Sequence, residues 1–315
     1  AAAGAGPVPG AKPLKAVAAG RPVVLGVPLA LPRQAREGLC QLAFEQLGAK
    51  ALFLGSTAFL SVLGAGQATG VLLDVGEAGA CAVPFVEGYP LAQCAARSSA
   101  GGALLSAGMA GFLQEAGAEL PDGGSWPVAG REVKEQLAYV APCFAEELQQ
   151  LHGGKLSPQR CELPGGVPFQ AARGEGFRCG ELLFDPSSAS SGGQPPGEAG
   201  AKALGIHELV VSSLRLQSDV NLRGRLLDGG LLLAGGSSLL KGLPERLLSE
   251  VRLQSPWVAP GKKPEEVQLH APVERGSLAW QGGAALAECD VLRQLWTTRA
   301  QYREEGPGAI HRTFL

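Results

Sequence analysis

The sequence carries almost no net charge. It has 27 lysines and arginines against 29 aspartates and glutamates, which gives a formal net charge of −2 and a pI near 6.2. A protein with this balance has no general basic field to attract nucleic acid or an acidic lipid surface. We therefore expect no direct contact with nucleic acid.

Residue pairs at metal-binding spacing are also missing. The seven cysteines are odd in number and widely spaced, no CxxC pair occurs, and the four histidines add no metal-ligand spacing. This pattern argues against a disulfide framework or a zinc site and favours a reducing compartment. No GxSxG, HExxH or Walker motif is present, and no fixed-period repeat appears.

One uncharged stretch, residues 51–73, is nominally long enough to span a bilayer. Its middle is rich in Gly, Ser, Thr and Gln, which predicts a strand, a short helix, a glycine turn and a second strand. We expect no membrane insertion. The start of the chain also lacks the apolar run of a secretory signal.

What the chain does contain is typical of a globular protein, with 45% hydrophobic and 18% charged residues. Two segments of low complexity stand apart. Residues 1–20, rich in Ala, Gly and Pro, predict a disordered leader, and residues 187–200 predict a flexible surface loop.

Between these segments, apolar strand patterns alternate with helical ones, which predicts an α/β architecture. The expected strands are 22–30, 51–55, a hairpin within 70–91, 231–234 and 267–272, with a short hairpin or loops in 161–173. The expected helices are 32–47, a short one capped by Ser56 or Thr57, 101–119, 131–151, 205–228, 244–253 and 279–295.

Three short segments could carry chemistry. A glycine turn at 74–79, between two predicted strands, could turn backbone N–H groups toward phosphate oxygens, and Asp74 could hold a magnesium-bound water. Gly235-Gly236-Ser237-Ser238 follows a buried strand, as phosphate-binding or ribose-binding turns do. The third is the charged run 131–135. Taken singly, each has an ordinary structural explanation: a hairpin turn, a capped helix start and a solvated helix face.

Their order adds to their weight, because several separated segments resemble actin and actin-related proteins. These segments are LLDVGEAGACAVPFVEGYPL (72–91), EVKEQLAYV (132–140), FRCGELLFDP (177–186), GIHELVVSS (205–213), LLLAGGSSLLKGLPERLLSEV (231–251) and nearly all of 270–315. They keep the order and nearly the spacing of that family, and the resemblance covers about residues 21–315.

The resemblance implies an actin-like ATPase fold of the ribonuclease-H-like α/β class. It implies a first domain built from 21–64 plus 277–315, and an intact second domain at 65–276 with 101–203 as its inserted helical part. The family's first phosphate loop and the small outer subdomain after it have no counterpart in the sequence. We therefore expect the first domain to be incomplete and the chain to be shortened at its N-terminus.

The resemblance also implies a nucleotide site. The matching positions are Asp74, Gly76, Glu77, Lys134, Glu135, Gly236, Ser237 and Leu239, with Asp74 reaching Mg²⁺ through water. Other matching positions depart from the family pattern. Thr57 replaces a glutamine and Cys81 a histidine beside the attacking water, Ala78 replaces a turn glycine, and Gly276 replaces a lysine that packs on the base. Since hydrolysis needs a positioned water, we do not expect efficient hydrolysis. Because one of the two clamping loops of the family has no counterpart, we expect ATP or ADP with Mg²⁺ to bind weakly or not at all.

These departures favour a structural or scaffold protein of a cytoskeletal or chromatin-associated assembly over an enzyme, with no catalytic residue assigned. Its expected partners are other proteins, such as actin-family or cytoskeletal subunits. Its expected location is the cytoplasm and cytoskeleton, with the nucleus as an alternative. Two other readings stay open: a protein that uses ATP as a structural ligand or switch, and an active ATPase that polymerises.

Overall fold

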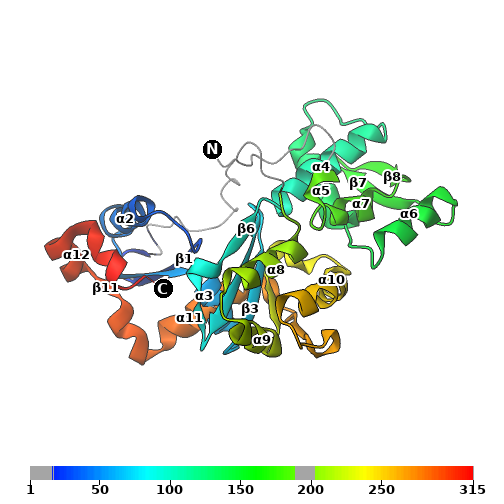
Figure 1. Cartoon of the computed structure of the whole chain (residues 1–315). Helices are drawn as coiled ribbons and strands as arrows, with labels where there is room; N and C mark the ends of the chain where they lie inside the picture. The colour runs from blue at the N-terminus through cyan, green and yellow to red at the C-terminus, as the bar shows by residue number, and fades with distance from the viewer. Residues whose placement is uncertain (1–15, 17, 189–202, 315) are drawn as a thin grey trace. The chain divides into compact units, whose positions relative to one another are not determined.

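The computed structural model describes residues 16, 18–188 and 203–314 (Figure 1). The predicted leader, residues 1–20, and the predicted loop, residues 187–200, fall largely outside the described residues. The chain divides into two compact units. Unit 1 comprises Ala1–Ala65 and Ala279–Leu315, and unit 2 comprises Gly66–Leu278.

Unit 1 is built around a three-stranded sheet in the order β1-β2-β11. Strand β1 (Pro22–Val27) runs parallel to β2 (Ala51–Ser56), and β11 (Thr297–Thr298) pairs antiparallel with β2. The helices of this unit are α2 (Arg33–Gln41), α3 (Thr57–Ala65) and α12 (Arg299–Glu305), a π-helical turn η1 (Leu42–Gln46), and the 3₁₀ segments η7 (Asp290–Leu295) and η8 (Gly306–Arg312). Helix α11 (Leu278–Glu288) begins at the boundary between the units.

The side chains of β2 separate two apolar clusters. Leu52 and Leu54 pack with Phe44 and Ile310, whereas Phe53 packs with Trp296 on the opposite side. This division follows from the two-residue period of a strand, which sends successive side chains to opposite faces. The run 51–55 was predicted as a buried strand, and the structure confirms it.

Two local predictions at the ends of helices have different outcomes. The predicted cap at Ser56 is confirmed, because its Oγ accepts a hydrogen bond from the Phe59 N–H at 3.1 Å. The predicted helix over 32–47 is a helix that ends in a π turn, where the Leu47 N–H reaches the Leu42 carbonyl at 3.0 Å.

Unit 2 contains a mixed sheet in the order β10-β9-β3-β4-β5, with β6 also paired to β4. Its strands are β3 (Gly70–Val75), β4 (Ala80–Val86), β5 (Tyr89–Pro90), β6 (Ala96–Ser98), β9 (Leu231–Ala234) and β10 (Leu269–His270). Strands β3 and β4 form the predicted antiparallel hairpin, and β9 lies parallel to β3 on its other side. All four residues of β9 are buried, which matches its unbroken apolar sequence.

Three helices pack around this sheet, and the rest of unit 2 forms a second group of helices with one hairpin. Around the sheet lie α8 (Ile206–Leu216), α9 (Val220–Gly229) and α10 (Leu243–Val258). The second group, from the predicted inserted part, contains α4 (Gly102–Glu115), α5 (Trp126–Leu137), α6 (Phe144–His152), α7 (Glu175–Glu181) and the hairpin β7 (Gln159–Leu163) and β8 (Val167–Ala171) (Figure 1). Short 3₁₀ segments are η2 (Ala92–Cys94), η3 (Pro186–Ser188), η4 (Gly236–Leu239), η5 (Pro264–Glu266) and η6 (Arg275–Ser277).

One apolar core joins the two groups. It includes Leu73 of β3, Met109 of α4, Cys179 of α7 and Leu209 of α8, all fully buried. The sheet and the inserted part of unit 2 therefore fold around shared side chains.

Several predicted helices are wrong in extent, and the one predicted over 244–253 runs from Leu243 to Val258. The helix predicted over 131–151 begins earlier, at Trp126, and stops at Leu137, because Ala138 is extended and the Val140 N–H donates to the Lys241 carbonyl at 2.8 Å. The helix predicted over 205–228 is two helices, and Asp219 caps the second by accepting from the N–H groups at 221 and 222. The helix predicted over 279–295 ends as an α-helix at Glu288.

The uncharged stretch 51–73 forms β2, α3 and the first part of β3, as its polar middle predicts. Among the residues that the structure describes, no helix has the length and apolar character needed to cross a membrane.

Candidate functional site

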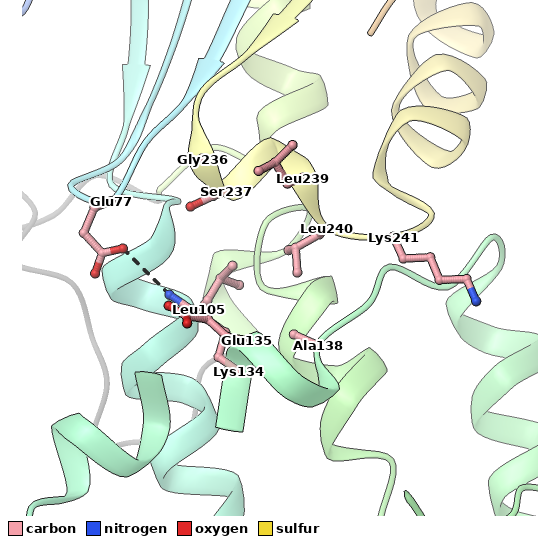
Figure 2. A pocket seen from close by; sticks show the side chains of 10 residues that line it. All are labelled: Glu77, Leu105, Lys134, Glu135, Ala138, Gly236, Ser237, Leu239, Leu240 and Lys241. Carbon is pink, nitrogen blue, oxygen red and sulfur yellow. Dashed lines mark ion pairs between the residues drawn. The ribbon is translucent and has the colours of Figure 1, made fainter. Parts of the chain in front are cut away.

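Unit 2 contains a cavity of about 560 Å³, within the size range of small-molecule and cofactor sites. It is lined by Glu77, Leu105, Lys134, Glu135, Ala138, Gly236, Ser237, Leu239, Leu240 and Lys241 (Figure 2). We call it the unit 2 pocket. Six of the eight residues predicted to contact a nucleotide are in this set: Glu77, Lys134, Glu135, Gly236, Ser237 and Leu239. The other two, Asp74 and Gly76, are not among the lining residues.

The first wall is the turn between β3 and β4. The Gly76 N–H closes this turn by donating to the Gly79 carbonyl at 2.9 Å, so this amide is not directed at a ligand. The turn puts its positive φ on Gly79 and not on Ala78. Ala78 therefore does not have to adopt the left-handed conformation that would require glycine.

The same turn caps helix α4. The carbonyls of Gly76 and Glu77 accept hydrogen bonds from the N–H groups of Gly102 and Ala103 at 2.9 and 2.8 Å. Two of the amide groups that a helix start leaves free are thereby used inside the protein. The position of the turn is fixed by these bonds and by the Ser237 hydroxyl, which donates to the Gly76 carbonyl at 3.1 Å.

Asp74 is the penultimate residue of β3, just before this turn. It pairs with Cys81 across the hairpin and with Ala234 of β9 on the other side. Burial raises the pKa of its carboxyl group. The Asp74 carboxylate lies close to Gly235, the first residue of the turn after β9.

The second wall is the turn after β9. Gly235 has φ of 91°, and a Cβ at this position would collide with the Asp74 carboxylate and the Val75 carbonyl. Both the left-handed backbone and the lack of space require glycine. The Ser237 side chain, from the next turn of chain, joins this wall to the β3–β4 turn through its bond to Gly76.

The third wall is helix α5, which supplies a buried ammonium. The Lys134 Nζ donates to the Ser106 hydroxyl at 2.9 Å and to the Gly102 carbonyl at 3.2 Å. It also lies 3.7 Å from the Glu77 carboxylate (Figure 2). Glu135, the next residue, pairs with Arg131 at 3.6 Å on the exposed face of the helix, as the i,i+4 spacing predicts.

Leucines form the apolar part of the pocket. Leu239 is half exposed and lies beside Gly276. A Cβ added at Gly276 would lie 3.2 Å from the Leu239 Cδ1 atom. Leu105 and Leu240 add further apolar surface. A pocket with a few converging polar groups on an apolar lining has the usual composition of a ligand site.

Comparison with protein families shows to which family this sequence belongs. The family model for actin matches residues 11–122 and 129–315, nearly the whole chain. The chain belongs to the actin family. The predicted α/β fold of the actin-like class is confirmed, and the match begins ten residues before the resemblance seen in the sequence.

Two positions of this actin-family chain carry the departures expected to matter for hydrolysis. Cys81 lies on β4 between Asp74 and Arg97, its partners on the two neighbouring strands. Burial raises the pKa of its thiol, although Arg97 acts in the opposite direction. Thr57 belongs to unit 1, where it is the first residue of α3.

The unit 2 pocket fits a nucleoside in size and polarity, with Lys134, Glu135 and Ser237 as the groups that could hold it. Among the described residues, no group of three or more His, Cys, Asp and Glu side chains could hold a metal ion. Asp74 therefore belongs to no such group among these residues. Because Mg²⁺ is often bound by one or two carboxylates together with substrate phosphates, Asp74 could contribute only alongside a bound phosphate.

Sequence reasoning missed part of the pocket. The residues that it did not find are Leu105, Ala138, Leu240 and Lys241 in the lining, and Gly102 and Ser106 as partners of Lys134. The bonds from Lys134 to Gly102 and Ser106 span 32 and 28 residues. No local pattern marks such partners, because they meet only when α4 packs against α5.

Proposed function

We propose that this actin-family protein is a structural or scaffold component of a cytoskeletal or chromatin-associated assembly, and that it turns over ATP at no more than background rate. Its partners would be other proteins, above all actin-family or cytoskeletal subunits, without direct contact to nucleic acid. We expect it in the cytoplasm with the cytoskeleton, or alternatively in the nucleus.

The observation that carries this proposal is the thiol of Cys81 beside Asp74. Phosphoryl transfer to water depends on a group that orients the attacking water in line with the terminal phosphate. A thiol is a weak hydrogen-bond donor and a weak acceptor. Since burial raises its pKa, the Cys81 side chain stays neutral at physiological pH and cannot serve as a base.

The replacement of a glutamine by Thr57 supports the same conclusion, because a hydroxyl on a short side chain reaches less far than an amide. Catalysis by positioning is sensitive to such changes, and a displacement of about 1 Å can cost a hundredfold in rate. With both positions changed, efficient hydrolysis is not expected.

Phosphate release from Mg·ATP by the purified protein tests this proposal. We expect a rate equal to that of a blank without protein, for wild type and for Asp74→Ala alike. A clear ATPase rate that Asp74→Ala abolishes would overturn the proposal. The scaffold role is tested separately by cross-linking in cells, where actin-family or cytoskeletal subunits should be recovered with the chain.

A second candidate function is favoured by the unit 2 pocket itself. The volume of the pocket, and the six lining residues that belong to the predicted nucleotide-contact set, support a function in which the protein keeps a nucleotide as a structural ligand or switch. Anything that binds only the folded state raises the unfolding temperature in proportion to the logarithm of its concentration. Nucleotide released from the denatured purified protein, together with a rise in Tm on adding Mg·ATP, would support this role, and the absence of both would exclude it.

A further inference from the structure

Two serines of the chain are followed directly by proline, Ser157 and Ser255. The sequence has no other Ser-Pro pair and no Thr-Pro pair. The two differ at the third position after the serine, which is the basic Arg160 in one case and the apolar Val258 in the other. The dipeptide alone does not choose between the two serines, so their surroundings in the fold have to decide.

The structure gives the two serines opposite environments. Ser255 lies inside α10 and is 1% exposed, and its hydroxyl donates to the Arg252 carbonyl at 2.9 Å. Ser157 lies in the loop between α6 and β7 and is exposed (Figure 1). Its hydroxyl has no hydrogen-bond partner among the residues that the structure describes. Only Ser157 is therefore open to an enzyme that acts on serine.

The backbone around Ser157 suits an enzyme that binds a linear segment. Residues 155–158 belong to no helix or strand, and a residue before proline favours extended conformations. Strand β7 continues the segment from Gln159 onward. Because Cys161 and Leu163 of this strand are buried, the alternation of side chains puts Arg160 on the outer face of the hairpin.

Cations flank the serine on both sides. Lys155 and Arg160 are exposed, and neither forms an ion pair with another described residue. Both charges are thus free to meet acidic groups of a partner. Leu156 anchors the loop from below, since it lines a cavity of about 50 Å³ together with Tyr139 and Phe177.

We propose that Ser157 is a phosphorylation site of a proline-directed serine/threonine kinase that also reads the positive charge of Arg160. The kinase transfers the γ-phosphoryl group of Mg·ATP to the Ser157 Oγ atom. The new O–P bond forms as the bond to the ADP oxygen breaks, and the hydroxyl proton passes to a base of the kinase.

Both neighbours of the serine have a physical role in this recognition. Pro158 has no N–H, so a kinase pocket without an acceptor at this point admits proline and disfavours any residue that would bury an unpaired N–H. Arg160 adds a charge-assisted hydrogen bond to an acidic group of the kinase. Ser255 offers neither exposure nor a cation at the matching position.

Phosphate on Ser157 adds about −1.5 to −2 charges at pH 7 between two exposed cations. Since water screens contacts between exposed charges, the packing of unit 2 changes little. The modification therefore alters the surface that the α6–β7 loop presents to other proteins.

Phosphorylation of the full, folded chain by a purified cyclin-dependent kinase with Mg·ATP, with sites mapped by mass spectrometry, tests the proposal. The proteins compared are wild type, Ser157→Ala, Pro158→Ala and Arg160→Gln. Ser255→Ala is the matched control, because it removes the serine of the other Ser-Pro pair. Thermal unfolding establishes that each variant is folded, and a synthetic peptide of residues 151–165 measures recognition without the fold.

We expect wild type and Ser255→Ala to take up phosphate at Ser157 at equal rates, and Ser157→Ala to take up none at a Ser-Pro pair. Pro158→Ala should slow the reaction by about tenfold or more, and Arg160→Gln by about twofold to fivefold. Phosphate at Ser255 in place of Ser157, or equal rates for wild type and Pro158→Ala, would overturn the proposal. So would a folded chain that takes up no phosphate, and uptake by the peptide alone would show that the fold hides the site.

Discussion

Arg246 on α10 is the centre of a charged cluster that should be costly to disrupt. Its side chain is 13% exposed, and its guanidinium lies over the Phe184 ring at 4.9 Å. It donates to both carboxylate oxygens of Glu181 at 3.4 Å, to Glu250 at 2.7 Å and to the Ala141 carbonyl at 3.2 Å. This one guanidinium therefore joins α10, the end of α7 and the chain segment after α5.

We expect Arg246→Met to lower the free energy of unfolding by about 3 kcal/mol at neutral pH, the lower end of the range for removing one partner of a buried ion pair. Methionine keeps much of the stem that packs against Phe184 and removes the charge. Glu181, whose side chain is 12% exposed, is then left as a nearly buried carboxylate without its cation. We use the lower end of the energy range because the Arg246 and Glu181 side chains both keep some contact with water.

The loss should depend on pH. Burial already raises the pKa of Glu181, and Arg246 acts in the opposite direction. Removing the arginine raises this pKa further in the folded protein, so the folded state holds more protons than the unfolded state over a wider range. Stability then falls as pH rises through that range, and the destabilisation is larger at pH 7.5 than at pH 5.

Urea unfolding followed by far-UV circular dichroism at these two pH values measures both effects. The matched control is Arg131→Met, which removes an arginine from an ion pair whose partners are each 65% exposed, and which should cost at most about 0.5 kcal/mol. A loss below about 1 kcal/mol for Arg246→Met, or a loss that is the same at both pH values, would refute this account of the cluster.

Three further predictions concern single positions. Gly235→Ala should lower the free energy of unfolding by about 2 kcal/mol or more, because Gly235 has φ of 91° and a Cβ there would collide with the Asp74 carboxylate. Gly224→Ala, in open space on α9, should raise it by about 0.5–1 kcal/mol. Equal melting temperatures for the two variants would contradict this. Alkylation of the native protein at pH 8, mapped by mass spectrometry, should modify exposed Cys143 quickly and leave Cys179 intact. The reason is that burial raises the pKa of Cys179 to about 12. Equal alkylation rates at the two cysteines would count against the fold around α7. Asp74→Asn should raise Tm at pH 7 and have less effect at pH 4. Burial raises the pKa of the Asp74 carboxyl group, so its ionised form lowers the stability of the folded protein. A lower Tm for the variant at pH 7 would mean that the charge has a stabilising partner.

Local sequence patterns were enough to predict the strands that carry two walls of the site, and one helix start in unit 1. The apolar run of β9, the hairpin of β3 and β4, and the Ser56 cap all follow from interactions between residues a few positions apart. Such short-range features depend on backbone geometry and on burial of one continuous run, both of which can be read from neighbouring residues.

The helix predicted over 131–151 failed for the opposite reason. The chain leaves the helix at Ala138 because residues 139 and 140 pair with Lys241, about a hundred residues later in the sequence. A helical pattern cannot reveal a competing partner at that distance. Tertiary pairing overrode a moderate helix preference there.

By itself the sequence determined the family, the α/β class with its main buried strands, and six of the residues that line the unit 2 pocket. The strands follow from apolar patterns along the chain, whereas the family and the six residues follow from the resemblance to actin and actin-related proteins. The tertiary structure decided what each of these residues does, because it packed α4 against α5 and brought Gly102 and Ser106 to Lys134. Only this packing gives the lysine its partners and sets the Glu77 carboxylate beside it, since charge and hydrogen-bond interactions depend on distance in space and not on separation in sequence.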